Sequence, residues 1–136
     1  KKTILTKNIK PMKLTVLDVD NDKIPEIIGT YICTPRLKER AVLFFIAAKN
    51  KAGAYTFQYS HIDEFREDEV MSQDITAIDE GIYTEKLLDI LDTENSGVAK
   101  IFTMTLSFEG AGFTIYKRNG SVWEKELEVS NYHCGY

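Results

Sequence analysis

An internal repeat places the strongest limit on how this chain of 136 residues can fold. The segment that begins at Leu14 (LTVLDVDNDKIPEII) aligns without a gap with the segment that begins at Leu88 (LDILDTENSGVAKIF). The strand and hairpin that follow also recur, at a slightly shorter offset, as the pair Asn50 and Asn119 illustrates. Because order and spacing both recur, the chain is expected to contain two copies of one supersecondary unit.

Each copy carries the residue patterns of β-strands joined by tight turns. Alternating and β-branched runs predict strands at residues 13–19, 26–33, 40–48 and 54–60, and then at 101–108, 113–118 and 122–129. In residues 101–108 a row with Phe102 and Met104 alternates with a row of Ile101 and Thr103. The Asn119–Gly120 dipeptide predicts a hairpin, because both residues tolerate positive φ.

The predicted architecture is a single all-β domain, residues 1–136. It has two antiparallel four-stranded β-meanders, at about residues 13–60 and 84–130, around an acidic and helical insert at residues 61–83. Two such sheets cannot close a β-propeller, which takes about four to eight blades. They are therefore expected to pack as a sandwich or open barrel, and a fragment of a β-propeller is the alternative.

Composition excludes several classes of function. The net charge of −4 argues against a nucleic-acid partner. The longest apolar run, Ala41–Ala48, is far shorter than the ~20 residues of a membrane span. The sequence contains no nucleophile elbow, Walker loop, zinc motif or dinucleotide fingerprint, so a non-catalytic protein is expected. His61 near Asp63 is interpreted as a histidine of a surface loop rather than as part of an acid–base device.

The loop between the first two predicted strands carries the clearest chemical signal. Asp18, Asp20, Asp22 and Glu26 occupy its first, third, fifth and ninth positions, and the carbonyl of Ile24 occupies the seventh. Calcium prefers six to eight hard oxygen ligands in irregular geometry, which this spacing supplies. Crowded carboxylates also repel one another unless a cation is present. The sequence therefore predicts one bound Ca²⁺ in this loop; a turn without Ca²⁺ is the alternative.

This loop resembles the calcium loop of the FG-GAP repeats found in integrin-type β-propellers and bacterial surface proteins. The likeness is strong over residues 15–30 and extends to the second copy through layout only. It implies that Asp18, Asp20, Asp22 and Glu26 are Ca²⁺ ligands with a structural role. One departure is Lys23, which stands where the family has a glycine that supports a tight turn.

The equivalent loop of the second copy is expected to have lost its metal. Its four corresponding positions are Asp92, Glu94, Ser96 and Lys100, with Gly97 at the glycine position. Lys100 replaces the ninth-position carboxylate, so its ammonium is expected to neutralise Asp92 and Glu94 internally.

The two cysteines, Cys33 and Cys134, are expected either to form a disulfide or to remain unpaired thiols. The family resemblance and this pair favour a periplasmic or extracellular location. The expected function is a calcium-stabilised binding or structural module of a bacterial envelope or secreted protein, with an unknown protein or glycan as partner. The alternative is a periplasmic enzyme inhibitor or carbohydrate-binding protein. Tyr55, Phe57 and Tyr59 alternate along one predicted strand and are expected to share one core-facing side.

Overall fold

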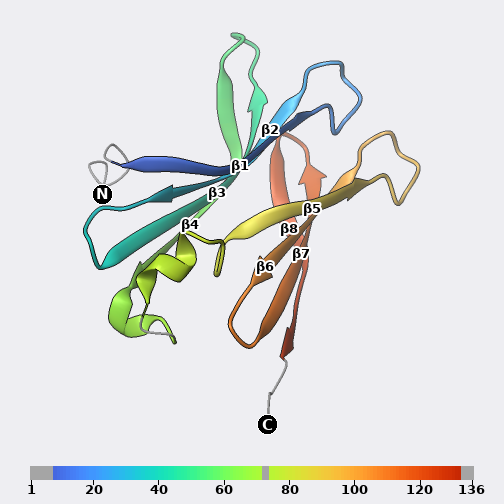
Figure 1. The fold of residues 1–136 in the computed structure, drawn as a ribbon. Helices are drawn as coiled ribbons and strands as arrows, with labels where there is room; N and C mark the ends of the chain where they lie inside the picture. Colours follow the sequence, from blue (N-terminus) through green and yellow to red (C-terminus); the bar gives the residue numbers. More distant parts are fainter. Residues whose placement is uncertain (1–7, 72–73, 133–136) are drawn as a thin grey trace.

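The computed structural model describes residues 8–71 and 74–132, and it confirms the predicted all-β architecture (Figure 1). Two four-stranded antiparallel sheets follow the chain in sequence order, β1-β2-β3-β4 and then β5-β6-β7-β8. Neither sheet closes into a barrel within the described ranges, and the two pack on each other as a sandwich does.

The observed strands are close to the predicted ones. The first sheet contains β1 (Ile9–Leu17), β2 (Glu26–Cys33), β3 (Glu39–Lys49) and β4 (Tyr55–Arg66). The second contains β5 (Glu85–Leu91), β6 (Lys100–Leu106), β7 (Gly110–Asn119) and β8 (Val122–Tyr132). The main difference concerns residues 61–66, which the sequence places in the insert. They continue β4 because β3 begins at Glu39 and supplies hydrogen-bonding partners along their whole length.

The strand registers follow the sequence repeat. Leu17 pairs with Glu26, and Leu91 pairs with Lys100, which are the equivalent positions of the second copy. The β3–β4 ladder shifts register after Ile46, and the β7–β8 ladder shifts after Ile115, the residue that corresponds to Ile46 in the repeat. The two sheets are thus the same meander with the same bulge.

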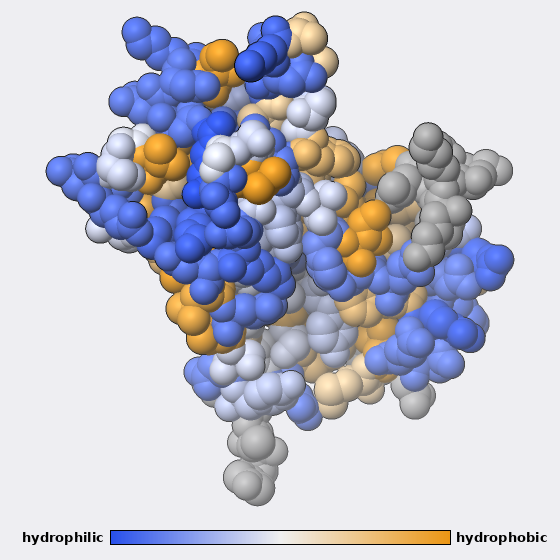
Figure 2. All heavy atoms as spheres, turned by 180° about the vertical axis from the view of Figure 1, so that it is seen from behind, coloured by the Kyte–Doolittle hydropathy of each residue, from blue (hydrophilic) through white to orange (hydrophobic). Residues whose placement is uncertain are grey.

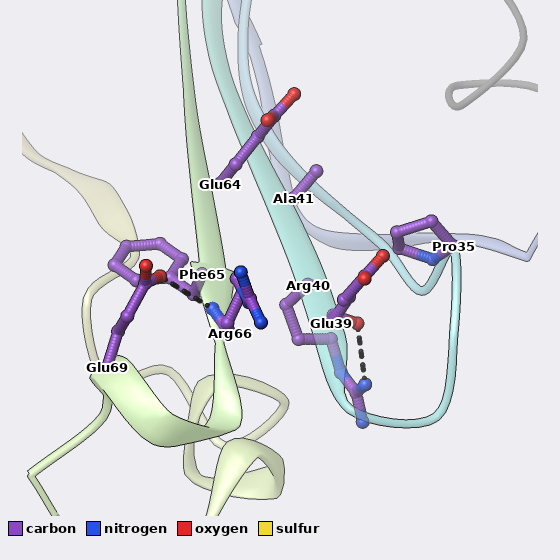
Figure 3. A pocket seen from close by; sticks show the side chains of 8 residues that line it. All are labelled: Pro35, Glu39, Arg40, Ala41, Glu64, Phe65, Arg66 and Glu69. Atoms are coloured by element: carbon purple, nitrogen blue, oxygen red, sulfur yellow. Dashed lines mark hydrogen bonds between the residues drawn. The ribbon is translucent and has the colours of Figure 1, made fainter.

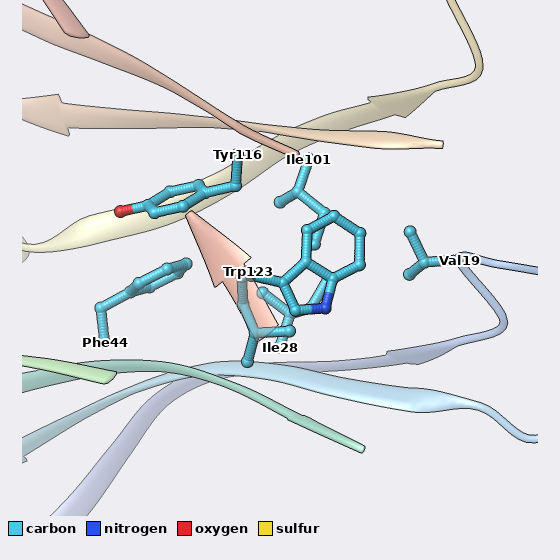
Figure 4. Packing of buried hydrophobic residues seen from close by; sticks show 7 residues of the cluster. Val19, Ile28, Phe44, Ile101, Tyr116 and Trp123 are labelled. Atoms are coloured by element: carbon cyan, nitrogen blue, oxygen red, sulfur yellow. The ribbon is translucent and has the colours of Figure 1, made fainter. Parts of the chain in front are cut away.

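The main core lies between the two sheets (Figure 4). Ile28, Phe44 and Ile46 of the first sheet meet Ile101, Tyr116 and Trp123 of the second, and Val19 closes one end. The rings of Phe44 and Tyr116 stack with centroids 5.5 Å apart. Replacing a buried aromatic of this kind with alanine typically costs about 3–5 kcal/mol.

A second cluster explains the insert. The strands of the first sheet extend beyond the second sheet. The insert covers this extension, where its residues Val70, Ile75 and Ile78 pack against Ile32 and Val42. This segment contains two short 3-10 helices, Glu67–Glu69 and Ile75–Ile78. Among the described residues, no helix has the length and apolar character to cross a membrane.

A buried ion pair fastens the insert to the first sheet. The Arg40 side chain is only 6% exposed and donates from Nε and Nη2 to the two carboxylate oxygens of Asp79, each at 2.8 Å. This bidentate arrangement compensates the charge that burial of Arg40 would otherwise leave unpaired.

One prediction about side-chain facing is wrong. Phe57 pairs with Ala47, but Tyr59 pairs with Ile46, so Gln58 is an extra residue in a β-bulge. A bulge of this kind reverses the alternation of side chains along a strand. Tyr59 therefore enters the core and contacts Phe44 and Tyr116, whereas Phe57 lies on the opposite face of the sheet.

Candidate functional site

The first acidic loop, residues 18–25, is shaped by its own aspartates. The Asp18 carboxylate accepts the backbone N–H groups of Asp22 at 3.1 Å and Lys23 at 2.9 Å. Asp22 Oδ1 accepts the N–H of Ile24 at 2.7 Å. Short acidic side chains favour such turns because they satisfy backbone donors that no strand partner reaches.

The second acidic loop, residues 92–99, has the same turn. The Asp92 carboxylate accepts the N–H groups of Ser96 at 3.0 Å and Gly97 at 2.7 Å, at the same spacings as Asp18. Gly97 has φ of +84°, and Lys23 at the equivalent position has φ of +72°. Lys23 thus adopts the left-handed conformation that normally favours glycine.

Three of the predicted ligands converge in the first loop. One carboxylate oxygen from each of Asp18, Asp20 and Asp22 can be chosen so that all lie within 4.8 Å of one another. Glu26 does not belong to this group. It is 2% exposed, and its Oε2 accepts the backbone N–H of Val19 at 2.9 Å. Ile24, whose carbonyl is the predicted ligand, contacts the loop through its backbone N–H, which donates to Asp22.

Charge crowding in the first loop affects Glu26. Burial raises the pKa of Glu26, and the nearby carboxylates of Asp22 and Asp18 raise it further, against the hydrogen bond from Val19. The second loop shows the opposite behaviour. There the N–H groups of Ser96 and Gly97 lower the pKa of Asp92. Burial is the main cause of the shift at Glu26, whereas backbone donors within the turn are the main cause at Asp92.

Both loops receive a cation from the second half of the chain. Arg118 of β7 forms an ion pair with Asp20, whose side chain is 8% exposed. Lys100 lies 2.7 Å from Glu94 and 2.8 Å from Glu126. The predicted contact between Lys100 and Glu94 is therefore present. Within residues 8–71 and 74–132, the second partner of Lys100 is Glu126 and no ion pair joins it to Asp92.

The two loops lie together at one end of the molecule, where the blue and the yellow-orange loops project side by side (Figure 1). The N–H of Ala99 donates to the carbonyl of Val19 at 2.9 Å. Together with the pair of Arg118 and Asp20, this bond joins the first acidic loop to the second sheet. A cation held by Asp18, Asp20 and Asp22 would therefore act at the junction of the sheets as well as within one turn.

A cleft between β4 and β8 was not found from the sequence. It has a volume of about 410 Å³, and its lining includes His61, Asp63, Tyr83, Glu85 and Lys125. The Glu85 carboxyl accepts hydrogen bonds from Thr103 at 2.5 Å and Tyr116 at 2.8 Å, and burial raises its pKa. A glutamate at the start of a strand gives no sequence signal of burial.

A smaller cavity of about 280 Å³ lies at the far end of the first sheet (Figure 3). Glu39, Arg40, Arg66 and Glu69 gather there from β3, β4 and the start of the insert. Arg40 is committed to Asp79, and the N–H of Arg66 donates to Glu69 at 3.1 Å. These contacts hold the strand ends and the insert together, so we assign the cavity a structural role.

Of the two cysteines, Cys33 lies among the described residues. Cys33 is buried at the end of β2. Cys134 lies outside the described residues, so a bridge between the two stays a prediction. His61, expected in a loop, lies on β4 with its Nε2 atom 2.8 Å from Asp63.

Comparisons of this chain with protein families, with curated proteins and with solved structures find no match. The FG-GAP resemblance therefore stays a prediction that rests on the residues of the first loop.

Proposed function

We propose that this chain is a non-catalytic, calcium-stabilised module that serves binding or structural support in an envelope or secreted protein. The observation that carries the proposal is the convergence of Asp18, Asp20 and Asp22 within 4.8 Å in a loop that contacts the second sheet. Its equivalent loop has a serine and a lysine at two corresponding positions and supplies its own ammonium group.

Calcium fits the donor set because the ligands are three carboxylates that converge in one turn. Ca²⁺ tolerates irregular coordination and can take further oxygens from water or backbone carbonyls, whereas Mg²⁺ demands near-octahedral geometry. Asp20 would share its charge between the ion and Arg118. Binding would thus strengthen a junction that also contains the backbone hydrogen bond from Ala99 to Val19 and the packing of Val19 in the core.

The non-catalytic part of the proposal rests on how the polar groups in the cleft are used. His61 contacts Asp63, and Glu85 is held by Thr103 and Tyr116. The backbone carbonyl of Glu85 also accepts a hydrogen bond from Thr30 of the first sheet. The bond from Thr30 joins the two sheets, and the other contacts hold side chains within one sheet. These are structural roles for groups that would otherwise suit acid–base chemistry.

Carbohydrate binding is a second candidate because of the cleft between β4 and β8. Its lining combines an aromatic side chain, Tyr83, with charged groups such as Asp63 and Lys125. Recognition sites for small polar ligands commonly combine apolar surface with a few polar groups. A glycan array with the wild type and a Lys125→Ala variant tests this candidate. Sugar binding that is lost in the variant would support it, and the absence of any bound sugar would remove it.

The calcium proposal is tested with two matched variants. Asp18→Asn and Asp92→Asn each weaken a carboxylate that accepts two backbone N–H groups at the same place in the turn. Their effects on folding should therefore be similar in EDTA. Only Asp18→Asn should lose calcium binding in titration calorimetry and the accompanying rise in melting temperature.

For the wild type, one ion per chain is expected. At a free concentration 100 times the dissociation constant, calcium should add about 2.7 kcal/mol to the free energy of unfolding. An unchanged melting temperature between EDTA and excess calcium would reduce the loop to an ordinary turn. Two sites of similar affinity would contradict the assignment of the second loop.

The proposed location is tested separately through the cysteines. A bridge between Cys33 and Cys134 is expected in protein produced under oxidising conditions. A thiol assay on the denatured, unreduced protein should then detect no thiol. Two reactive thiols would remove this support for an extracytoplasmic location.

A further inference from the structure

The two faces of each sheet can be compared position by position, because the strand registers follow the repeat. We call face A the one that carries Ile28, Ile46 and Tyr59 in the first sheet. These three form one cross-strand row, and the equivalent row of the second sheet is Phe102, Ile115 and Leu127. Face B is the opposite face, with Ile27 and Ala47 in the first sheet and Ile101 and Tyr116 in the second.

The sheets meet through unlike faces. The main core contains Ile28 and Ile46 from face A of the first sheet, and Ile101 and Tyr116 from face B of the second. The second sheet therefore buries face B, which is the face that the first sheet leaves on the outside. A pseudo-twofold sandwich would bury the same face of both copies, so the observed packing is a head-to-tail stacking.

The face that the second sheet buries is the less apolar of its two. Thr103 and Thr114 of face B are 1% and 7% exposed, within the interface region. Face A of the same sheet is left outside, although large apolar side chains fill its centre and charged residues such as Lys86 and Asp89 lie at its edge strand. Its members include Phe102, Met104, Leu106, Phe113, Ile115, Leu127 and Val129, of which Leu127 and Val129 are nearly half exposed.

The outer face of the first sheet is also apolar. Val16 pairs with Ile27 and Leu14 pairs with Gly29 on face B, and Val16 and Phe57 are each 60% exposed. A groove of about 380 Å³ runs along this face, lined by Ile9, Tyr31, Cys33, Ala41, Leu43 and Phe57. Apolar side chains also reach the surface in several places when the molecule is seen from behind (Figure 2). Large exposed apolar faces on a folded domain mark surfaces that are covered by a partner.

We propose that the partner is a second copy of this chain, bound head to tail. Face A of the second sheet in one copy would pack on face B of the first sheet in the next copy. This contact would repeat, between chains, the unlike-face contact that already holds the two sheets of one chain together. Each copy exposes face B of its first sheet and face A of its second sheet. The exposed face A of one copy can therefore pack on the exposed face B of the next.

Such an interface is heterologous, and heterologous contacts either close into rings or continue as filaments. Rings of radially packed four-stranded sheets typically contain four to eight sheets. With two sheets per chain, a closed ring would therefore hold about two to four copies. This inference is independent of calcium, because none of the contacting positions belongs to the acidic loops.

Two charge substitutions test the proposal. Leu127→Glu places a carboxylate on face A of the second sheet, and Val16→Glu places one on face B of the first. Both positions are substantially exposed in the single chain, so each variant should fold, which circular dichroism and thermal unfolding verify. Lys51→Glu in the β3–β4 hairpin, away from both faces, is the control.

Sedimentation equilibrium should show the wild type and Lys51→Glu as oligomers. Each of the other variants should dissociate to monomers, with affinity reduced by at least about tenfold. An equimolar mixture of Leu127→Glu and Val16→Glu should form a complex of two chains and nothing larger, because one intact surface of each type remains.

Three results would overturn the inference. The wild type could remain monomeric at the highest concentration at which it is soluble. Only one of the two variants could dissociate, which would mean that a face packs on its own counterpart. The mixture could fail to associate although both variants are folded, which would mean that the two faces are not complementary.

Discussion

The first and second acidic loops make the same pair of hydrogen bonds to the backbone, yet they balance their charges differently. Asp18 and Asp92 each accept N–H groups four and five residues ahead. The first loop then gathers two more aspartates around Asp18, whereas the second pairs its glutamate with Lys100. One turn geometry therefore supports either a cation site or an internal ion pair, and side-chain charge decides between them.

The largest effect is expected from converting the second loop into the first. Ser96→Asp supplies a third carboxylate beside Asp92 and Glu94, and Lys100→Glu replaces the competing ammonium with the carboxylate that the first loop has at Glu26. The double variant should bind a second calcium ion, which adds about 2.7 kcal/mol to the free energy of unfolding at 100 times its dissociation constant. Titration calorimetry should give a stoichiometry near two. A stoichiometry that remains at one would show that more than charge separates the loops.

The cations of the two loops should differ in importance. Arg118→Ala removes the cation from Asp20, whose side chain is 8% exposed in the wild type, which should cost about 1–3 kcal/mol in EDTA. Lys100→Ala leaves the more exposed Glu94 and Glu126, so its cost should be about 0–1 kcal/mol. Urea unfolding measures both.

The same two variants should also differ in their affinity for calcium. Arg118→Ala frees a carboxylate oxygen of Asp20 from its ion pair, so this variant should bind calcium more tightly than the wild type. The Lys100→Ala variant should bind it with unchanged affinity. Equal losses of stability for both variants in EDTA would contradict the distinction.

Lys23 and Gly97 occupy equivalent positions of the two loops with the same left-handed backbone conformation, so each can be replaced by the other residue type. Lys23→Gly should stabilise the protein by about 1 kcal/mol, because a residue with a side chain is strained at positive φ. Gly97→Lys should destabilise it by a similar amount, since open space surrounds Gly97 and only its φ opposes the side chain. Thermal unfolding in EDTA checks both signs. A destabilising Lys23→Gly would mean that the Lys23 side chain makes a favourable contact.

The smallest effects concern pH, and the two loops should respond in opposite directions. The pKa of Glu26 is raised above its ordinary value of 4.5, so its contribution to stability is complete below that pH and is lost as the pH rises through the folded-state pKa. The pKa of Asp92 is lowered from 3.8, so its contribution is present above that pH and is lost as the pH falls through the folded-state value.

Denaturant unfolding over about pH 3 to 7 in EDTA separates these contributions. Glu26→Gln keeps an oxygen acceptor for the Val19 N–H and should flatten the decline above pH 4.5. Asp92→Asn should flatten the decline below pH 3.8. If either variant kept the full pH dependence of the wild type, other groups would be responsible for it.

The sequence alone determined the local structure of this protein. Hydrophobic alternation and turn residues located the strands, because the strand period and the conformations of Asn–Gly turns are properties of a few neighbouring residues. The gapless match between the segments at Leu14 and Leu88 predicted the equivalent registers that the ladders show. It also placed Asp18, Asp20 and Asp22 in one loop, where spacing alone brings their carboxylates together.

Only the tertiary structure decided which face of each sheet is buried and where the charged groups find partners. Alternation along residues 101–106 defines two rows but not which row meets the first sheet, and the row that is buried contains Thr103 instead of Met104. The bulge at Gln58, the pair of Arg118 with Asp20, and the use of Glu26 at Val19 depend on segments that are distant in sequence or on a local extra residue. Local patterns fix backbone conformation because its energetics are short-ranged, whereas burial and ion pairing depend on which surfaces the whole chain brings together.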